Sequence, residues 1–306
     1  MAQHLIHIGY PKAGSTFLQA WFERRPDIRY ASGGLGGFNN VYEIGRPLDT
    51  VYKYFVTSFE GLSTPHESAG GVRLDFGGAE PEREDPLKEN QAGVCSLLES
   101  LYPGSRVLLV TRGFKGMIIS AYSQSVRMGA RLHLSSMCQK LAERLQSDAR
   151  HYYDYDYLIR LYGDAFGEAN LIVMPYELLR DDQVRFLAVL EEKLGLDHVE
   201  IKLGRLNPTL SPEELYWYPV ISRLVSSAAS RLGPVRFRRV YGWYVRKTLD
   251  NRLRPLIKVL RLLQPRRKIT EAEFPMEILS YCKGKATRLK DNPLYAPYAA
   301  EYLWDS

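Results

Sequence analysis

An apolar run that stops at a glycine-containing loop and passes directly into a helix sets the strongest limit on how this chain folds. The run is Leu5–Gly9, and the helical pattern is Ser15–Arg25, which Pro26 ends. Apolar residues at helical spacing follow an uninterrupted apolar run, so a buried strand should precede an amphipathic helix. A strand, a tight loop and a helix in this order are typical of the start of an α/β fold.

The rest of the chain repeats this alternation. Apolar runs at 106–111 and 170–174 predict buried strands, and 51–58 should end in another. Helices are expected at 114–128, 135–166 and 181–194, a loop at 63–93, and helices throughout the region after residue 207. We therefore expect an α/β protein with a P-loop-like parallel sheet flanked by helices and a helical C-terminal third. We expect one domain, 1–306, in which 216–306 is a basic helical extension packed on the 1–215 core.

Composition excludes several classes of protein. Hydrophobic residues make up 45% and charged residues 25%, which rules out collagen-like and wholly disordered chains. The three cysteines include no CxxC pair, so neither a disulfide scaffold nor a structural zinc site is expected. The N-terminus does not resemble a signal peptide, and no apolar stretch is long enough to span a bilayer. We expect a cytoplasmic protein.

Positive charge is concentrated in residues 221–268. This segment has fourteen basic residues and one acidic residue, Asp250, so its charge is +13; the whole chain is +6, which leaves −7 for the remainder. Apolar and aromatic residues alternate with the basic ones. This pattern suits basic amphipathic helices on an anionic surface, such as a membrane leaflet or an acidic polymer. A solvated basic face over an ordinary helical subdomain explains it equally well.

The loop at residues 9–16 has the setting of a phosphate-binding loop. It reads Gly-Tyr-Pro-Lys-Ala-Gly-Ser-Thr between the strand and the helix. The N–H groups and the dipole at a helix start favour an anion, and Lys12 adds a full positive charge. In the Walker pattern, however, a lysine follows the second glycine, where this chain has Ser15. An ordinary ATP or GTP site is therefore disfavoured. The alternative for Ser15 and Thr16 is that they only cap the helix.

Three motifs in order resemble those of PAPS-dependent sulfotransferases, especially bacterial, carbohydrate-type members. The first runs from Tyr10 to Gln19 and contains Pro-Lys-x-Gly-Ser-Thr. The second places Arg112 at a strand end and Ser120 eight residues later, although Gly113-Phe114 replaces the usual Asn-Pro. The third is the strand that ends in Tyr176-Glu177. The resemblance covers about residues 4–215 and is weak in the C-terminal third.

The resemblance implies PAPS as sulfuryl donor, PAP as product and no metal. Lys12 would stabilise negative charge on the departing 5′-phosphate, while Arg112 and Ser120 would hold the 3′-phosphate, which suits a forked guanidinium and a hydroxyl. Tyr176 would lie near the adenine. The backbone of Gly14, Ser15 and Thr16 would hold the 5′-phosphate, and Lys12 and Ala13 in the same loop are also expected to bind the donor. The segment Lys283–Lys285 is similar to another phosphate contact of the family, but we expect it to lie within a helix and assign it no role.

The general base of such a transfer would be a Glu or a His. Glu60 follows the predicted second strand, in a stretch similar to one in bacterial relatives, and His66 lies six residues later. We favour Glu60 over His66 and keep open that neither acts. The alternative interpretation is a surface residue for Glu60 and a solvated loop histidine for His66. His7, in the first strand, is expected to be a packed residue.

Three functions from different classes remain. The leading one is transfer of a sulfuryl group to an acceptor hydroxyl or amine by in-line displacement, with the acceptor on a sugar of a glycolipid or polysaccharide. The second is a P-loop-type kinase or NTPase, which lacks its lysine and a clear magnesium-binding aspartate. The third is a non-catalytic basic module that binds membrane. Residues 221–268 could hold an anionic membrane, which would place the protein peripherally at the inner membrane face. No nucleic-acid motif is visible, so no nucleic-acid partner is expected.

Overall fold

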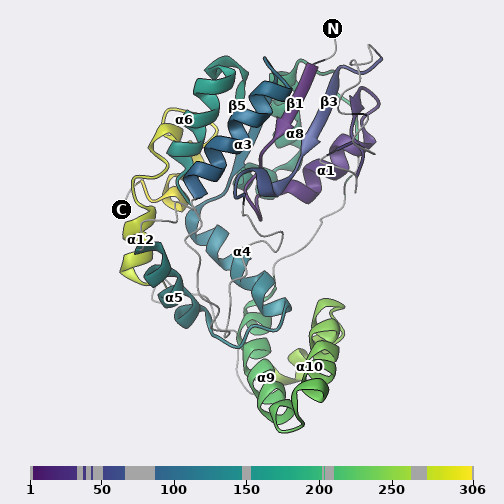
Figure 1. The fold of residues 1–306 in the computed structure, drawn as a ribbon, viewed down its shortest axis with the longest axis vertical. Coiled ribbons are helices and arrows are strands. Elements are labelled where there is room, and N and C mark those ends of the chain that lie inside the picture. Colours follow the sequence, from purple (N-terminus) through teal and green to yellow (C-terminus); the bar gives the residue numbers. More distant parts are fainter. Residues whose placement is uncertain are drawn as a thin grey trace.

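The fold is a five-stranded parallel sheet covered by helices, seen here in a computed structural model (Figure 1). The structure describes residues 3–32, 37–38, 43, 51–65, 87–146, 153–201, 203, 210–262 and 274–304. The strand order is β2-β3-β1-β4-β5, and all neighbouring pairs are parallel. The strands are β1 (Gln3–His7), β2 (Ile28–Arg29), β3 (Tyr54–Ser58), β4 (Arg106–Thr111) and β5 (Leu171–Pro175). The predicted α/β class is confirmed.

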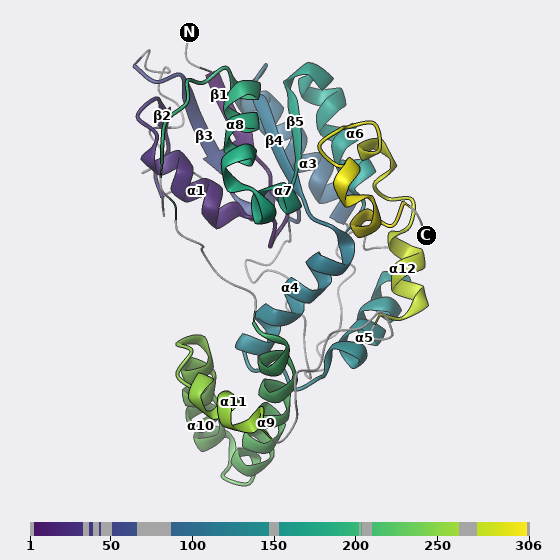
Figure 2. The same cartoon turned by 180° about the vertical axis from the view of Figure 1, so that it is seen from behind.

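Helices cover both faces of the sheet, as apolar parallel strands require. Five of the six residues of β4 are buried. One face is covered by α3 (Leu87–Leu101) and α6 (Tyr155–Phe166), the other by α1 (Ser15–Arg24), α7 (Tyr176–Asp181) and α8 (Gln183–Leu194) (Figures 1 and 2). Short 3-10 turns occur at Glu60–Leu62, Glu168–Asn170, Thr287–Leu289 and Ala296–Tyr302.

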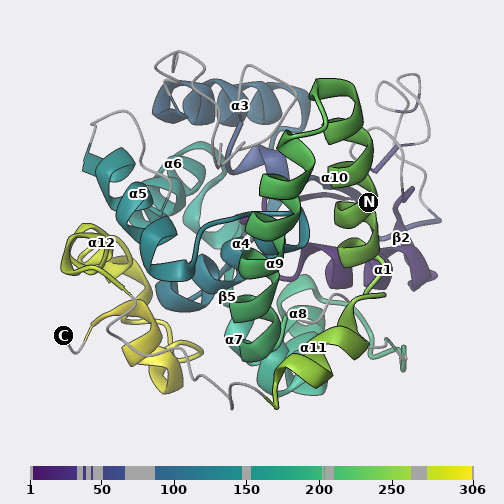
Figure 3. The ribbon, with the colours of Figure 1, turned by 90° about the horizontal axis from the view of Figure 1, so that it is seen from below.

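The remaining helices lie beyond the carboxyl edge of the sheet or beside it. Helix α4 (Phe114–Arg127) leads from β4 to a helical group of α9 (Pro212–Ser230), α10 (Pro234–Leu249) and α11 (Arg254–Leu260) (Figure 2). Figure 3 shows α9 and α10 packed lengthwise with α11 beside them. Helix α5 (Leu134–Gln146) pairs with α12 (Met276–Cys282). Among the described helices, none is both long and apolar enough to cross a bilayer.

The structure corrects several sequence-based boundaries. The predicted 63–93 loop is wrong at its end, because α3 begins at Leu87. The predicted 135–166 helix is two helices, α5 and α6, and 181–194 is divided where the Asp182 side chain caps α8 by accepting from the Arg185 N–H. Lys283–Lys285 lies just after α12, not within a helix. The two-residue β2 was not anticipated, since it is too short to show a pattern.

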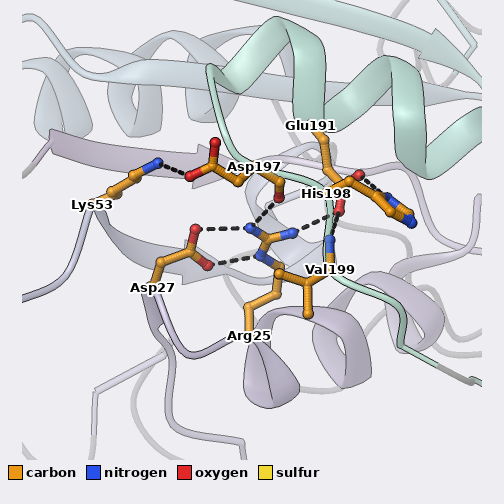
Figure 4. Close-up of polar contacts among 7 residues, drawn as sticks. All are labelled: Arg25, Asp27, Lys53, Glu191, Asp197, His198 and Val199. Atoms are coloured by element: carbon orange, nitrogen blue, oxygen red, sulfur yellow. Dashed lines mark hydrogen bonds and ion pairs between the residues drawn. The ribbon is translucent and has the colours of Figure 1, made fainter.

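A buried arginine ties α1 to α8 at the amino edge of the sheet (Figure 4). The Arg25 side chain is fully buried and donates to Asp27 at 2.7 Å and to Glu191 at 2.6 Å. Its Nη2 also donates to the Asp197 carbonyl at 2.9 Å. Lys53 and Asp197 form a second ion pair nearby, but both side chains are exposed. The buried pair is satisfied on all sides, so losing one partner would leave an uncompensated charge.

We expect Arg25→Ala to lower the free energy of unfolding by about 3–5 kcal/mol, because it leaves Glu191 buried without its arginine and with only His198 and a backbone N–H as described partners. Lys53→Ala, in the same cluster, should cost less than about 1 kcal/mol because its pair is exposed. Urea denaturation of both variants measures the contrast. Equal losses would show that the buried pair does not hold α1 against α8.

Candidate functional site

Parallel pairing brings the carboxyl ends of four strands, and the predicted site residues that follow them, to one edge. The end of β1 is level with that of β3, and the end of β4 with that of β5. The loop at 8–14 follows β1, Glu60 follows β3, Arg112 follows β4 and Tyr176 follows β5. Ligands of open parallel sheets bind at this edge.

The loop after β1 has a backbone that only a few residue types tolerate. Gly14 has φ +88°, and a side chain there would lie 2.6 Å from a methyl group of Leu179 on α7. Lys12 also has positive φ, 71°, which is unusual for a residue with a side chain. Such geometry persists only where the surroundings hold it, and it clusters at ligand sites.

The first turn of α1 is suited to hold an anion. No side chain caps this helix, so its first N–H groups point out of the helix end. Ser15 is buried, and its Oγ has no hydrogen-bond partner within the described protein. Thr16 is exposed and Ala13 is buried. A buried hydroxyl beside an uncapped helix start fits a ligand oxygen, because buried polar groups without partners are costly.

Arg112 connects β4 to this loop. Its Nη1 donates to the carbonyl of Lys12 at 2.7 Å, and its guanidinium lies over the ring of Tyr176, 4.3 Å from the centroid. Burial lowers the pKa of Arg112, and its Nε is buried without a partner in the described protein. One donor therefore braces the loop, while another is left for an incoming acceptor.

A buried network fixes the backbone around Arg112. The Tyr155 hydroxyl donates to the Arg112 carbonyl at 2.5 Å, and the Gly113 N–H donates to Glu177 at 2.9 Å. The other oxygen of Glu177 accepts from the Tyr302 hydroxyl at 3.0 Å. Burial raises the pKa of Glu177 above its ordinary value of 4.5. The turn that aims Arg112 is thus held by residues from α6, α7 and the C-terminal segment.

Helix α4 carries two further polar residues near the loop, Ser120 and Arg127. Gly116 lies against the Arg112 side chain, and Ser120 follows one turn later on the same side of the helix. Ser120 is half-buried and makes no side-chain hydrogen bond to another described residue. Arg127 in the last turn is near enough to Lys12 to lower the pKa of its amine. Arg127 was missed in the sequence, although it lies seven residues, two turns, after Ser120.

Glu60 is a described acid whose charge acts on Lys12. Burial lowers the pKa of the Lys12 amine below 10.5, the Glu60 carboxylate opposes this shift, and Arg112 and Arg127 add to it. Ser63 anchors the turn at Glu60, since its hydroxyl lies 3.1 Å from the Gly9 carbonyl and 3.0 Å from that of Glu60. The loop after β3 is therefore tied to the loop after β1.

His7 lies under the loop, as the packed residue that the sequence predicts. Its Nδ1 is 2.7 Å from Ser58 Oγ, and its Nε2 is buried without a partner in the described protein. A side chain at position 9 would meet His7 Nε2 at 2.6 Å and Ser15 Oγ at 3.1 Å. Gly9 thus lets the loop backbone pass close to both groups. Desolvation lowers the pKa of His7 from 6.5 to about 3.

The structure brings most of the predicted site residues together. Lys12 to Thr16, Arg112, Tyr176 and Glu60 lie around the loop, with Ser120 on the adjoining helix. Tyr176 begins α7 rather than ending β5. His66 lies outside the described residues. The catalytic and binding roles of all these residues stay predictions. In the part of the chain that the structure describes, no cluster of three His, Cys, Asp or Glu residues could hold a metal ion.

Comparison with known proteins finds similar structures but no similar sequences. No family model and no curated protein matches the chain. A sulfotransferase from Alicyclobacillus acidocaldarius matches 79% of this chain and 96% of its own, with 16% identity and a TM-score of 0.42. Mouse sulfotransferase SULT7A1, solved in complex with PAP, matches 65% of this chain and 60% of its own, with 15% identity and a TM-score of 0.39. Because both identities and both TM-scores are low, the proposed function rests on the geometry of the site.

The buried, neutral His7 predicts acid sensitivity. Because its folded pKa is depressed, its contribution to stability is full above pH 6.5 and is lost as pH falls toward about 3. Over this range the free energy of unfolding should fall by about 1 kcal/mol more per pH unit than in His7→Asn, whose amide can still bond to Ser58 but does not titrate. Urea denaturation at several pH values measures the two slopes. Parallel curves would contradict the prediction.

Proposed function

We propose that this protein is a sulfotransferase that moves a sulfuryl group from PAPS to an acceptor hydroxyl or amine. The observation that carries the proposal is the meeting of three anion-binding groups at one edge of the sheet. These are the uncapped start of α1, the half-buried Lys12 and the Arg112 guanidinium. Ser15 Oγ and Arg112 Nε, both buried without partners in the described protein, fit the oxygens of a phosphorylated donor.

The residues divide the donor between two subsites. The first turn of α1 and the backbone from Lys12 to Thr16 would hold the 5′-phosphate. Arg112 and Ser120 would hold the 3′-phosphate, and Tyr176, already stacked on Arg112, would border the adenine. PAPS supplies an activated sulfuryl group, and PAP leaves as the product. The proposed transfer uses no metal.

Transfer proceeds by in-line displacement. The acceptor oxygen or nitrogen attacks sulfur as the bond from sulfur to the 5′-phosphate oxygen breaks, and the acceptor proton goes to a general base. Lys12 stabilises the charge that develops on the departing phosphate. Glu60 is the favoured base because its carboxylate is close enough to Lys12 to raise the pKa of that amine, which puts it near the departing phosphate. His66 remains the second candidate.

We place the acceptor on a sugar of a glycolipid or polysaccharide. The basic segment 221–268 supports this choice, because its charge suits an acidic or membrane-bound acceptor. A P-loop kinase or NTPase is the competing function. It is less well supported because Ser15 stands where the Walker lysine belongs.

Calorimetric titration with PAP in the absence of magnesium should show binding that is much tighter than that of ADP. Ser120→Ala is the cleanest variant, because this hydroxyl has no described protein partner to lose, and it should weaken PAP by about tenfold. Arg112→Ala should weaken it more strongly, by a hundredfold or so. Ser120→Ala should leave the weak ADP binding unchanged, since ADP lacks the 3′-phosphate, whereas Arg112→Ala should weaken ADP as well because Arg112 also braces the Lys12 loop. Binding of ADP that requires magnesium would instead support the NTPase.

Glu60→Gln should lower kcat for sulfuryl transfer by about 10²–10⁴-fold, because the amide cannot accept the acceptor proton. PAP affinity should change little, which separates a base from a donor-binding residue. Radiolabelled PAPS and a panel of acidic and neutral glycans provide the assay. Unchanged kcat in Glu60→Gln would exclude Glu60 as the base, and His66→Ala would then test the second candidate.

A further inference from the structure

Helices α10 and α11 lie at the end of the molecule away from the sheet (Figure 2) and belong to a strongly basic part of the chain. Between Ile221 and Leu262 the chain has eleven basic residues and one acidic residue, Asp250, so this part carries +10. Asp250 pairs with Arg252, and Arg254 pairs with Glu214. Asp250 is the one acidic residue between Ile221 and Leu262, so most of the other basic residues there have no acidic partner within these residues.

One side of α10 holds the helix to the protein. Tyr244 is buried and its hydroxyl lies 2.8 Å from Ser222 Oγ on α9. The Tyr241 hydroxyl donates to the Gly129 carbonyl, just after α4. Thr248, one turn after Tyr244, is also buried. These positions define the inner side of α10 and leave the opposite side to solvent.

The opposite side of α10 is a stripe of arginines around a tryptophan. Arg236, Arg239, Trp243 and Arg246 are separated by three, four and three positions, which places them on one side of a helix. All four are exposed, and Trp243 has 55% of its surface accessible. The Lys247 amine lies 5.5 Å from the Trp243 ring centroid. Cations and an indole ring are thus combined on one face.

Helix α11 and the residue pair after it add exposed aliphatic side chains. Val259 and Leu262 are 60% and 81% accessible, and Leu256 is also exposed. Lys258 and Arg261 alternate with them. Apolar side chains this exposed are costly in water, whereas a bilayer interface accepts both the apolar groups and their basic neighbours.

We propose that this surface, made by the exposed residues of 231–262, binds the headgroup region of an anionic lipid bilayer. The arginines and lysines fit the negative leaflet, and Trp243 fits the interface between headgroups and acyl chains. The exposed aliphatic residues favour a lipid over a soluble polyanion, which offers charge but no apolar layer. The inference goes beyond the proposed function and does not depend on it.

The test measures how much of the full chain co-sediments with vesicles of phosphatidylcholine, prepared with and without phosphatidylglycerol. The protein should bind only the anionic vesicles, and added salt should release it. Replacement of Arg236, Arg239 and Arg246 by Ser should weaken this binding by about a hundredfold. The matched control replaces Lys140, Arg185 and Lys290, three exposed basic residues on other elements, and should bind almost as wild type.

Trp243 reports whether the surface enters the interface. Brominated lipids in the anionic vesicles should quench its fluorescence, and the quenching should disappear in Trp243→Phe. Equal loss of binding in the two triple variants would overturn the proposal, as would binding to dextran sulfate with no quenching by brominated lipid. PAP titration of every variant keeps the outcomes separate, because failure at the membrane with intact PAP binding leaves the proposed function standing.

Discussion

The hydrogen bond from Arg112 to the carbonyl of Lys12 is the contact on which the geometry of the site depends. It joins the loop after β1 to the end of β4, two segments one hundred residues apart in the chain. Lys12 has a positive φ at this point of the loop. Two residues later Gly14 is the N-cap of α1, and because glycine has no side chain the first N–H groups of the helix are left uncapped. The same short loop therefore both receives the arginine and forms the anion site.

The backbone on both sides of Arg112 is held by residues near the C-terminus, and this holds the arginine in position toward the loop. Thr111, the residue before Arg112, shares its hydroxyl with Tyr295 at 2.8 Å and Tyr302 at 3.0 Å. Tyr302 also reaches Glu177, which in turn holds the Gly113 N–H. All of these groups are buried, so each bond forms in a low dielectric and a lost partner is expensive. The final residues of the chain are thus a structural part of the site.

Local sequence patterns predicted most of the strands and helices. What these patterns could not predict depends on contacts between residues that are far apart in the chain. The strand at 106–111 was identified in full because four consecutive apolar residues stand between Arg106 and Thr111. Likewise the loop motif placed Lys12 and Gly14 beside the start of α1. No local pattern predicts the hydrogen bond from Tyr302 to Glu177 or the one from Ser63 to the Gly9 carbonyl, because these pairs form only when distant segments pack together. Arg127, by contrast, was missed although the sequence shows its helical spacing from Ser120, so a local pattern could have found it.

Helix α4 relates the two proposed surfaces to each other. It begins beside Arg112, carries Ser120, and ends with Arg127 just before Gly129, which receives Tyr241 of α10. Its 14 residues span about 20 Å, and Ser120 and the Lys12 neighbour Arg127 lie along that length, so one rigid element carries part of the donor site and contacts the basic helices. A bilayer held by α10 and α11 would therefore have a fixed position relative to the donor. Such an arrangement would suit the glycolipid acceptor proposed above, because donor and acceptor would be held by the same element.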